Sequence, residues 1–282
     1  MFESIGRSLT LVRTSWDILM DDKKLLAFPV LSGIVTILVI LTFVLPLFLT
    51  GGQLASGSGS VVGLVYLFIF YVVSYFVVIF FNTALIACVN ARLNGKTMTV
   101  GEGMSVSFKH LPAILGWAVI SATVGLILNL LEERAGFIGD IVLAMIGGVW
   151  SLVTYFVVPV LILEDKGVID SLKESVTLIK KTWGESIVGS ASMAIIFVVI
   201  GIIAGIGVFA TMMLGNSTVF MAALALFLLL VVVLAVVYSA MQGIFVTALY
   251  TYAKTGTVPT AFNPDLIKNA FQPKQGNLQG NI

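Results

Sequence analysis

Six apolar runs, each long enough to cross a lipid bilayer, constrain the fold of this chain more than any other feature. They lie near residues 25–49, 61–89, 112–131, 137–163, 187–214 and 218–249. A helix needs about 20 apolar residues to cross the hydrocarbon core. Only 10% of the residues are charged, whereas about 25% are charged in ordinary soluble proteins. The sequence therefore predicts an all-α, multi-pass integral membrane protein with six transmembrane helices.

The basic residues predict the orientation of these helices. When the six runs are threaded in order through a membrane, all of the 15 Lys and Arg residues except Arg134 fall on one side. Basic residues favour the cytoplasmic side, so we expect a cell-membrane protein with both termini in the cytoplasm. The net charge of +1 and the lack of a dense basic run argue against a nucleic-acid partner.

A short segment occurs twice in the chain. Residues 8–16 read SLTLVRTSW and residues 175–183 read SVTLIKKTW. In both copies the apolar residues recur at helical spacing, and each copy precedes an apolar run. We therefore expect each to be an amphipathic surface helix that leads into a transmembrane hairpin. Both copies precede odd-numbered spans, which are entered from the same side, so the repeats are predicted to be parallel.

These patterns predict one membrane domain over residues 1–272. Its repeats would cover about 1–90, 99–163 and 168–250, each built from a surface helix and a hairpin. Thr99 and Glu102 have the spacing of a capping box, which predicts a short helix after the second span. We expect Pro159 to kink the fourth span. Further predictions are a terminal interface helix at about 264–272, begun near Pro264, and a disordered tail at 273–282.

The repeated segments contain the residues that we expect at the membrane surface. Tryptophan prefers headgroup depth, and bases there can face anionic lipid or a protein partner. The predicted contact residues are Arg7, Arg13, Trp16, Lys173, Lys180, Lys181 and Trp183. From the apolar spacing, the second helix should bury Ile169, Leu172, Val176 and Ile179 together with Trp183.

Polar uncharged side chains form short stripes in two spans. They are Tyr71, Tyr75 and Asn82 in the second span, and Tyr238 and Gln242 in the sixth. Such stripes could line a path or cavity. They could equally fasten helices together by hydrogen bonds, as polar side chains do in membranes. The sequence leaves both interpretations open.

Ionisable side chains are absent from the apolar centres of the predicted spans, which hold no Asp, Glu, His, Lys or Arg. Intramembrane catalysis and ion-coupled transport usually need such groups at that depth. His110, the one histidine, has no catalytic partner nearby in the sequence, and the lone Cys88 has no metal-ligand spacing. We therefore expect neither an enzyme nor a cofactor or metal site.

Four segments carry a resemblance to a known group of proteins. They are VPVLILED at 158–165, SLKESVTL at 171–178 and TWG at 182–184, joined by the opening SWDILMDDKKLLAFPVLSG at 15–33. With these segments the chain resembles a family of uncharacterised, largely archaeal six-span membrane proteins. More distantly it is similar to the membrane domain attached to some bacterial glycerophosphodiester phosphodiesterases. The resemblance implies the six-span fold and no activity, because the catalytic domain of those enzymes has no counterpart in this sequence.

Two functions from different classes remain. The first is a non-catalytic accessory protein that organises membrane lipids or a membrane-protein partner at the cytoplasmic interface. The alternative is a transporter or channel for a small uncharged or lipid-like molecule, because six helices can enclose a path without charged groups. The sequence does not indicate an oligomeric state.

Overall fold

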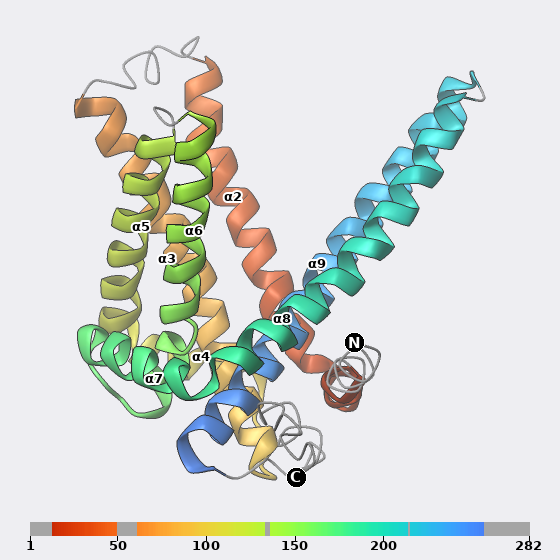
Figure 1. Cartoon of the computed structure of the whole chain (residues 1–282). Helices are drawn as coiled ribbons and strands as arrows, with labels where there is room; N and C mark the ends of the chain where they lie inside the picture. Colours follow the sequence, from red (N-terminus) through yellow and green to blue (C-terminus); the bar gives the residue numbers. More distant parts are fainter. Residues whose placement is uncertain (1–12, 50–60, 133–135, 214, 257–282) are drawn as a thin grey trace, which may run out of the picture. The chain divides into compact units, whose positions relative to one another are not determined.

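The computed structural model describes residues 13–49, 61–132, 136–213 and 215–256, with the side chains of 137, 138 and 181–192 left out (Figure 1). Within these ranges every regular element is helical. After a helix at 13–21 come η1 (Lys23–Leu26), α2 (Ala27–Leu49), α3 (Val61–Leu93), α4 (Val100–Lys109), α5 (Leu111–Glu132), α6 (Phe137–Val153), α7 (Val157–Leu163), α8 (Val168–Met213) and α9 (Ser217–Thr255). The predicted all-α fold is confirmed.

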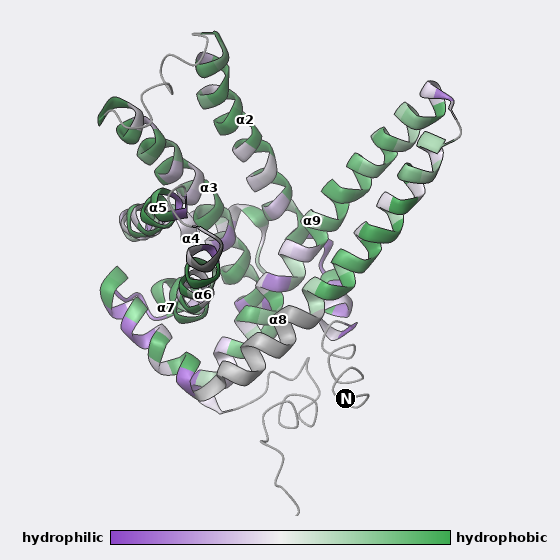
Figure 2. Cartoon of the chain, turned by 45° about the horizontal axis from the view of Figure 1, so that its top comes forward, coloured by the Kyte–Doolittle hydropathy of each residue, from purple (hydrophilic) through white to green (hydrophobic). Residues whose placement is uncertain are grey.

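Six stretches of these helices are long and apolar enough to cross a membrane, as the sequence predicts. Among the described residues they are Lys23–Leu49, Val61–Leu93, Leu111–Glu132, Gly139–Leu163, Met193–Met213 and Ser217–Thr255. Figure 2 shows apolar residues along most of α2, α9 and the last part of α8. The predicted helix at 264–272 and the tail at 273–282 lie outside the described residues.

The chain divides into two compact units. Unit 2 comprises Asp22–Ile179, and unit 1 comprises Met1–Asp21 together with Lys180–Ile282. The boundary falls inside α8, which contributes its first part to unit 2 and its remainder to unit 1. The predicted single domain and its internal repeats stay predictions.

Helix α3 is the element on which unit 2 is assembled, because it contacts α2, α4, α5 and α7. At about 1.5 Å per residue its 33 residues extend about 50 Å, whereas a hydrocarbon core is about 30 Å thick. All of its buried side chains lie at or beyond Val77. The second half of α3 is therefore the more deeply buried part, whereas the side chains of the first half are half-buried or exposed.

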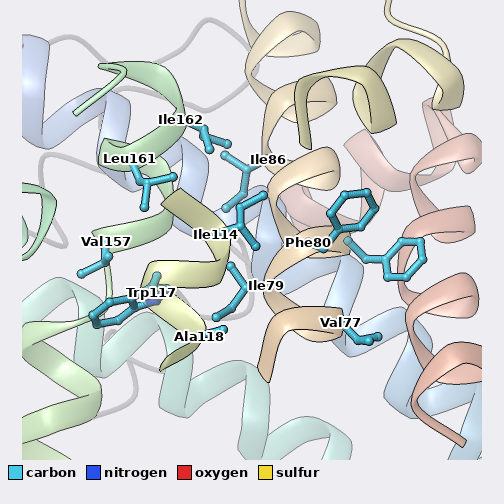
Figure 3. Close-up of a cluster of buried hydrophobic side chains, with 11 residues drawn as sticks. Val77, Ile79, Phe80, Ile86, Ile114, Trp117, Ala118, Val157, Leu161 and Ile162 are labelled. Carbon is cyan, nitrogen blue, oxygen red and sulfur yellow. The ribbon is translucent and has the colours of Figure 1, made fainter. Parts of the chain in front are cut away.

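The core of unit 2 lies where α3, α5 and α7 meet (Figure 3). Ile114, Trp117 and Ala118 of α5 are buried between side chains of the other two helices. Trp117 also stacks on Trp150 of α6, with ring centroids 5.9 Å apart. The cluster consists of Val77, Ile79, Phe80, Phe81, Ile86, Ile114, Trp117, Ala118, Val157, Leu161 and Ile162.

The fourth span is broken between α6 and α7, at residues 154–156. Pro159 has no N–H to donate to the carbonyl of Tyr155, four residues earlier, so a regular helix cannot continue through this point. The sequence predicts a kink from Pro159, and the structure places the interruption just before that residue, at the bond that proline removes.

Helix α4 begins with the predicted capping box. The Thr99 hydroxyl accepts a hydrogen bond from the Glu102 N–H at 3.2 Å, and the Glu102 carboxylate accepts one from the Thr99 N–H at 2.7 Å. The Thr99 N–H and, at 2.8 Å, the Thr99 hydroxyl both donate to this carboxylate, and these two bonds lower the pKa of Glu102. The cap fixes where α4 starts and therefore which of its faces meets α3.

The face of α4 that meets α3 is made of small residues. Ser107 is buried, and its hydroxyl donates to the carbonyl of Phe80 at 2.7 Å. A Cβ on Gly103 would lie 2.6 Å from Cys88 Sγ, 3.0 Å from the Ala84 carbonyl oxygen and 3.0 Å from Phe28 Cζ. The close approach of the two helices therefore requires glycine at position 103.

We expect Gly103→Ala to destabilise unit 2 by about 1–3 kcal/mol, the usual cost of overpacking a close contact. Gly101→Ala is the matched control, because it adds the same methyl group to the same helix with no atom within 4 Å. The control should be neutral or slightly stabilising, since alanine favours helix. Melting of the purified protein in detergent measures both variants. Equal melting temperatures for the two would contradict the packing described here.

Candidate functional site at the junction of two helix corners

The corner between α4 and α5 and the corner between α7 and α8 meet at one end of unit 2. His110 Nε2 of the first corner lies 3.3 Å from Asp165 Oδ1 of the second. Val168, at the start of α8, lies 3.2 Å from the position that a Cβ on Gly116 of α5 would take. We call residues 107–112 and 164–175 the junction site.

The histidine of the junction has partners that are distant in the sequence. His110 Nδ1 lies 2.8 Å from the carbonyl oxygen of Val106, and Nε2 faces the Asp165 carboxylate. Both neighbours are acceptors, so the ring satisfies them together only when both nitrogens carry protons. The sequence showed no partner near His110. The pair arises because the fold brings α7 back beside α5.

Lys166 is held inside the junction by two carboxylates. Its Nζ lies 2.8 Å from Glu164 and 3.3 Å from Glu174. The hydrogen bond to Glu164 is the main cause that raises the pKa of Lys166. The Ser171 hydroxyl also donates to the Lys166 carbonyl, at 3.4 Å. Lys166 therefore stabilises the turn into α8 and has its charge matched within the protein.

Lys109 and Lys173 differ from Lys166 because both are exposed. Lys173 lies 3.4 Å from Asp170, and the side chains are 73% and 68% exposed. Such pairs contribute about 0–1 kcal/mol, so Lys173 can readily exchange this partner. Lys109 makes no ion pair with any described residue. Two positive charges of the junction are therefore available to a ligand.

Each of these lysines lies beside an exposed apolar side chain. Phe108 is 58% exposed and Ile169 is 55% exposed. The sequence predicts burial of Ile169, and this prediction is wrong. The buried face of α8 instead contains Ser171, Ser175 and Leu178. These three residues share one side of the helix. Ile169 lies on the opposite side and therefore points away from the protein.

Ser175 explains why hydroxyl residues occupy this buried face. Its hydroxyl donates to the carbonyl of Val153 at 2.7 Å and accepts from the N–H of Phe156 at 3.0 Å. Val153 ends α6, and Phe156 lies in the break before α7. One side chain of α8 therefore satisfies both a donor and an acceptor that the broken fourth span leaves open.

We expect Ser175→Ala to lower the stability of unit 2 by about 1–3 kcal/mol, because it removes the hydroxyl that bonds both the Val153 carbonyl and the buried Phe156 N–H. The matched control is Thr177→Ala in the same helix. Thr177 is exposed, and its hydroxyl bonds only to the carbonyl of Lys173 within α8 among the described contacts. The control should change stability by less than about 0.5 kcal/mol. Thermal unfolding compares the two variants, and equal losses would exclude a bridging role for Ser175.

The other predicted surface residues fall in several places. Arg13 is exposed and Trp16 is 43% exposed, both in unit 1. In the same helix, Ser15, Ile18 and Leu19 are buried. Lys180 is exposed at the start of the unit 1 part of α8. Arg7 and the side chains of Lys181 and Trp183 lie outside the described part of the structure, so the comparison of the two repeated segments stays a prediction.

The polar stripes make aromatic contacts in each unit separately. In unit 2 the rings of Tyr71 and Tyr75 stack with centroids 6.2 Å apart. The Tyr75 hydroxyl lies 3.0 Å from the position of a Cβ on Gly125 of α5, and Asn82 is half-buried. In unit 1, Tyr238 packs edge-on against Phe197 at 5.4 Å, and Gln242 is half-buried. Whether these residues line a cavity or only fasten helices stays open.

The helices and their apolar surfaces define the class of this protein as a multi-pass helical membrane protein. Residues 61–260 match a family of unknown function, DUF6159, and the chain belongs to that family. No curated protein matches the chain. The likeness to largely archaeal proteins and to the membrane domains of bacterial glycerophosphodiester phosphodiesterases stays a prediction.

Proposed function

We propose that this is a non-catalytic accessory protein of the cell membrane, which organises lipid or a membrane-protein partner at the cytoplasmic surface. The observation that supports this most directly is the composition of the junction site. Exposed Phe108 and Ile169 stand beside exposed Lys109 and Lys173 at one end of the bundle. Apolar side chains next to bases are typical of elements that lie in a membrane interface.

The arrangement of charges supports the same function. Lys166 and His110 face carboxylates of the protein: the Lys166 pairs lie within the α7/α8 corner, and the His110 pair joins this corner to the α4/α5 corner. Lys109 and Lys173 remain available for anionic lipid headgroups or an acidic partner surface. Each base near an anionic membrane surface contributes about 1 kcal/mol of attraction. The repeated helices add Arg7, Arg13, Lys180 and Lys181, with Trp16 and Trp183 as proposed anchors at headgroup depth.

The proposal requires the junction to face the cytoplasm. With six spans, the segments 94–110 and 164–192 lie on the same side as both termini. Nearly all of the Lys and Arg residues fall on this side, because Arg134 is the one exception in the sequence. The asymmetry favours a cytoplasmic location for this side.

The topology can be tested with single cysteines. Ser58→Cys, in the segment between the first two spans, should react with an impermeant thiol reagent added to intact cells. Gly276→Cys, near the C-terminus, should react only after the cells are permeabilised. The reverse pattern would show that the junction faces outward and would overturn the proposed location.

The role of the lysines can be tested on α8. Lys180→Gln together with Lys181→Gln should lower the affinity for anionic lipid or partner by about 30-fold, because each base adds about 1 kcal/mol. Melting should hardly change, since exposed charges add little to stability. Lys180→Arg with Lys181→Arg is the control, because it keeps both charges. Retention is measured by mass spectrometry of the detergent-purified protein. Equal retention in both double variants would remove these lysines from the functional surface.

A second candidate is a carrier for small uncharged or lipid-like molecules. The break between α6 and α7 favours it, because discontinuous spans are common in transporters. However, the side chain of the fully buried Phe156 occupies this break, and the Ser175 hydroxyl bonds its backbone groups. Uptake of a tracer into vesicles that contain the protein would support the carrier over the accessory function.

A further inference from the structure

An apolar groove opens between α3 and α5 of unit 2. It has a volume of about 480 Å³, within the range of about 300–1,000 Å³ that is usual for ligand sites. The groove is lined by Val72, Val73, Phe76, Leu111, Pro112 and Leu115. Every lining side chain is apolar, so an occupant would be held by its shape and its hydrocarbon surface.

The groove belongs to the parts of α3 and α5 that are able to span the membrane. Its environment is therefore hydrocarbon, and the matching occupant is an acyl chain. Leu111 and Pro112 are the first residues of α5, so the groove reaches the end of that span. Pro112 has no N–H, so at this position the first turn presents no donor to the groove.

A row of aromatic rings connects the groove with the junction site. Phe76, which lines the groove, lies 5.9 Å from Phe80, and Phe80 lies 5.1 Å from Phe108 between ring centroids. Phe108 is exposed and directly precedes Lys109. From the other side, Leu111 of the groove follows Lys109 by two residues. Lys109 therefore lies at the edge of the groove.

The charge at this edge is positive and available. Lys109 is exposed and makes no ion pair with a described residue, whereas Asp165 is already directed at His110. A lysine ammonium binds phosphate oxygens as a compact point charge. An acyl chain in the groove would bring its phosphate to the interface end of α5, where Lys109 lies.

We infer that unit 2 binds an anionic phospholipid, with one acyl chain in the groove between α3 and α5 and the phosphate at Lys109. The inference rests on the proposed function at the membrane surface and names the lipid class and its place. It commits to an anionic lipid because all the side chains that line the groove are apolar and exposed Lys109 precedes the lining residue Leu111 by two positions.

Photolabelling in vesicles tests where the lipid binds. The full chain is reconstituted in phosphatidylcholine with a trace of phosphatidylglycerol that carries a diazirine on one acyl chain. After irradiation, adducts should concentrate on peptides that contain residues 72–76 and 111–115. Adducts spread evenly over the apolar surfaces would overturn the inference. Their absence from these peptides, as when a second copy covers the groove, would also overturn it.

Two tryptophan variants at matched positions test the groove itself. Val73→Trp fills it and should reduce labelling several-fold. Val78→Trp makes the same change at a side chain of α3 that is 50% exposed and does not line the groove, and labelling should persist. If melting shows that Val73→Trp does not fold, Leu115→Trp fills the groove from α5 instead. Equal labelling of the filled and control variants contradicts the inference.

Lysine variants test the headgroup. Lys109→Gln should lower the preference for phosphatidylglycerol over labelled phosphatidylcholine by about fivefold, as expected for one base at a membrane surface. Lys96→Gln removes an exposed lysine on the same side and is the control. An unchanged preference in Lys109→Gln overturns the anionic assignment. If the α8 lysine pair still controls lipid retention in that case, the proposed function stands and only this inference fails.

Discussion

The structure of unit 2 depends on giving every backbone N–H and carbonyl group a hydrogen-bond partner in helices that lie in a lipid bilayer. An N–H or carbonyl group without a partner costs several kcal/mol in hydrocarbon, so a broken span must find its partners elsewhere. Ser175 supplies two of them across the interruption between α6 and α7. This requirement fixes the start of α8 against the broken span and so places Lys173 and Ile169 outward.

The junction site separates charges that hold the protein together from charges that are left for a ligand. The pair of His110 with Asp165 joins the two corners and the pair of Lys166 with Glu164 stabilises the turn into α8, while Lys109 and Lys173 stay at the surface. The same separation holds for the apolar residues. Leu111 and Leu172 pack against the core, whereas Phe108 and Ile169 are exposed. Stability and ligand binding therefore rely on different side chains of the same corners.

Much of this fold is readable from local patterns, whereas the site is not. Length and hydropathy predict the six spans because a bilayer imposes one thickness on each. The spacing of Thr99 and Glu102 predicts the start of α4, since a capping box is a contact within one turn. The pairing of His110 with Asp165 is a contact between separate helices, which no local pattern encodes. Apolar periodicity misplaced Ile169 because the hydroxyl groups of Ser171 and Ser175 take the buried face.

The packing of α4 against α3 also limits the reactivity of the one cysteine in the sequence. Cys88 is 5% exposed, its thiol points to the Thr99 carbonyl at 3.7 Å, and Gly103 covers its sulfur. A buried thiol in apolar surroundings is inert to reagents. Cysteines introduced elsewhere can therefore be modified selectively in the natural chain. Reaction at Cys88 itself would show that α4 has separated from α3 and exposed the thiol.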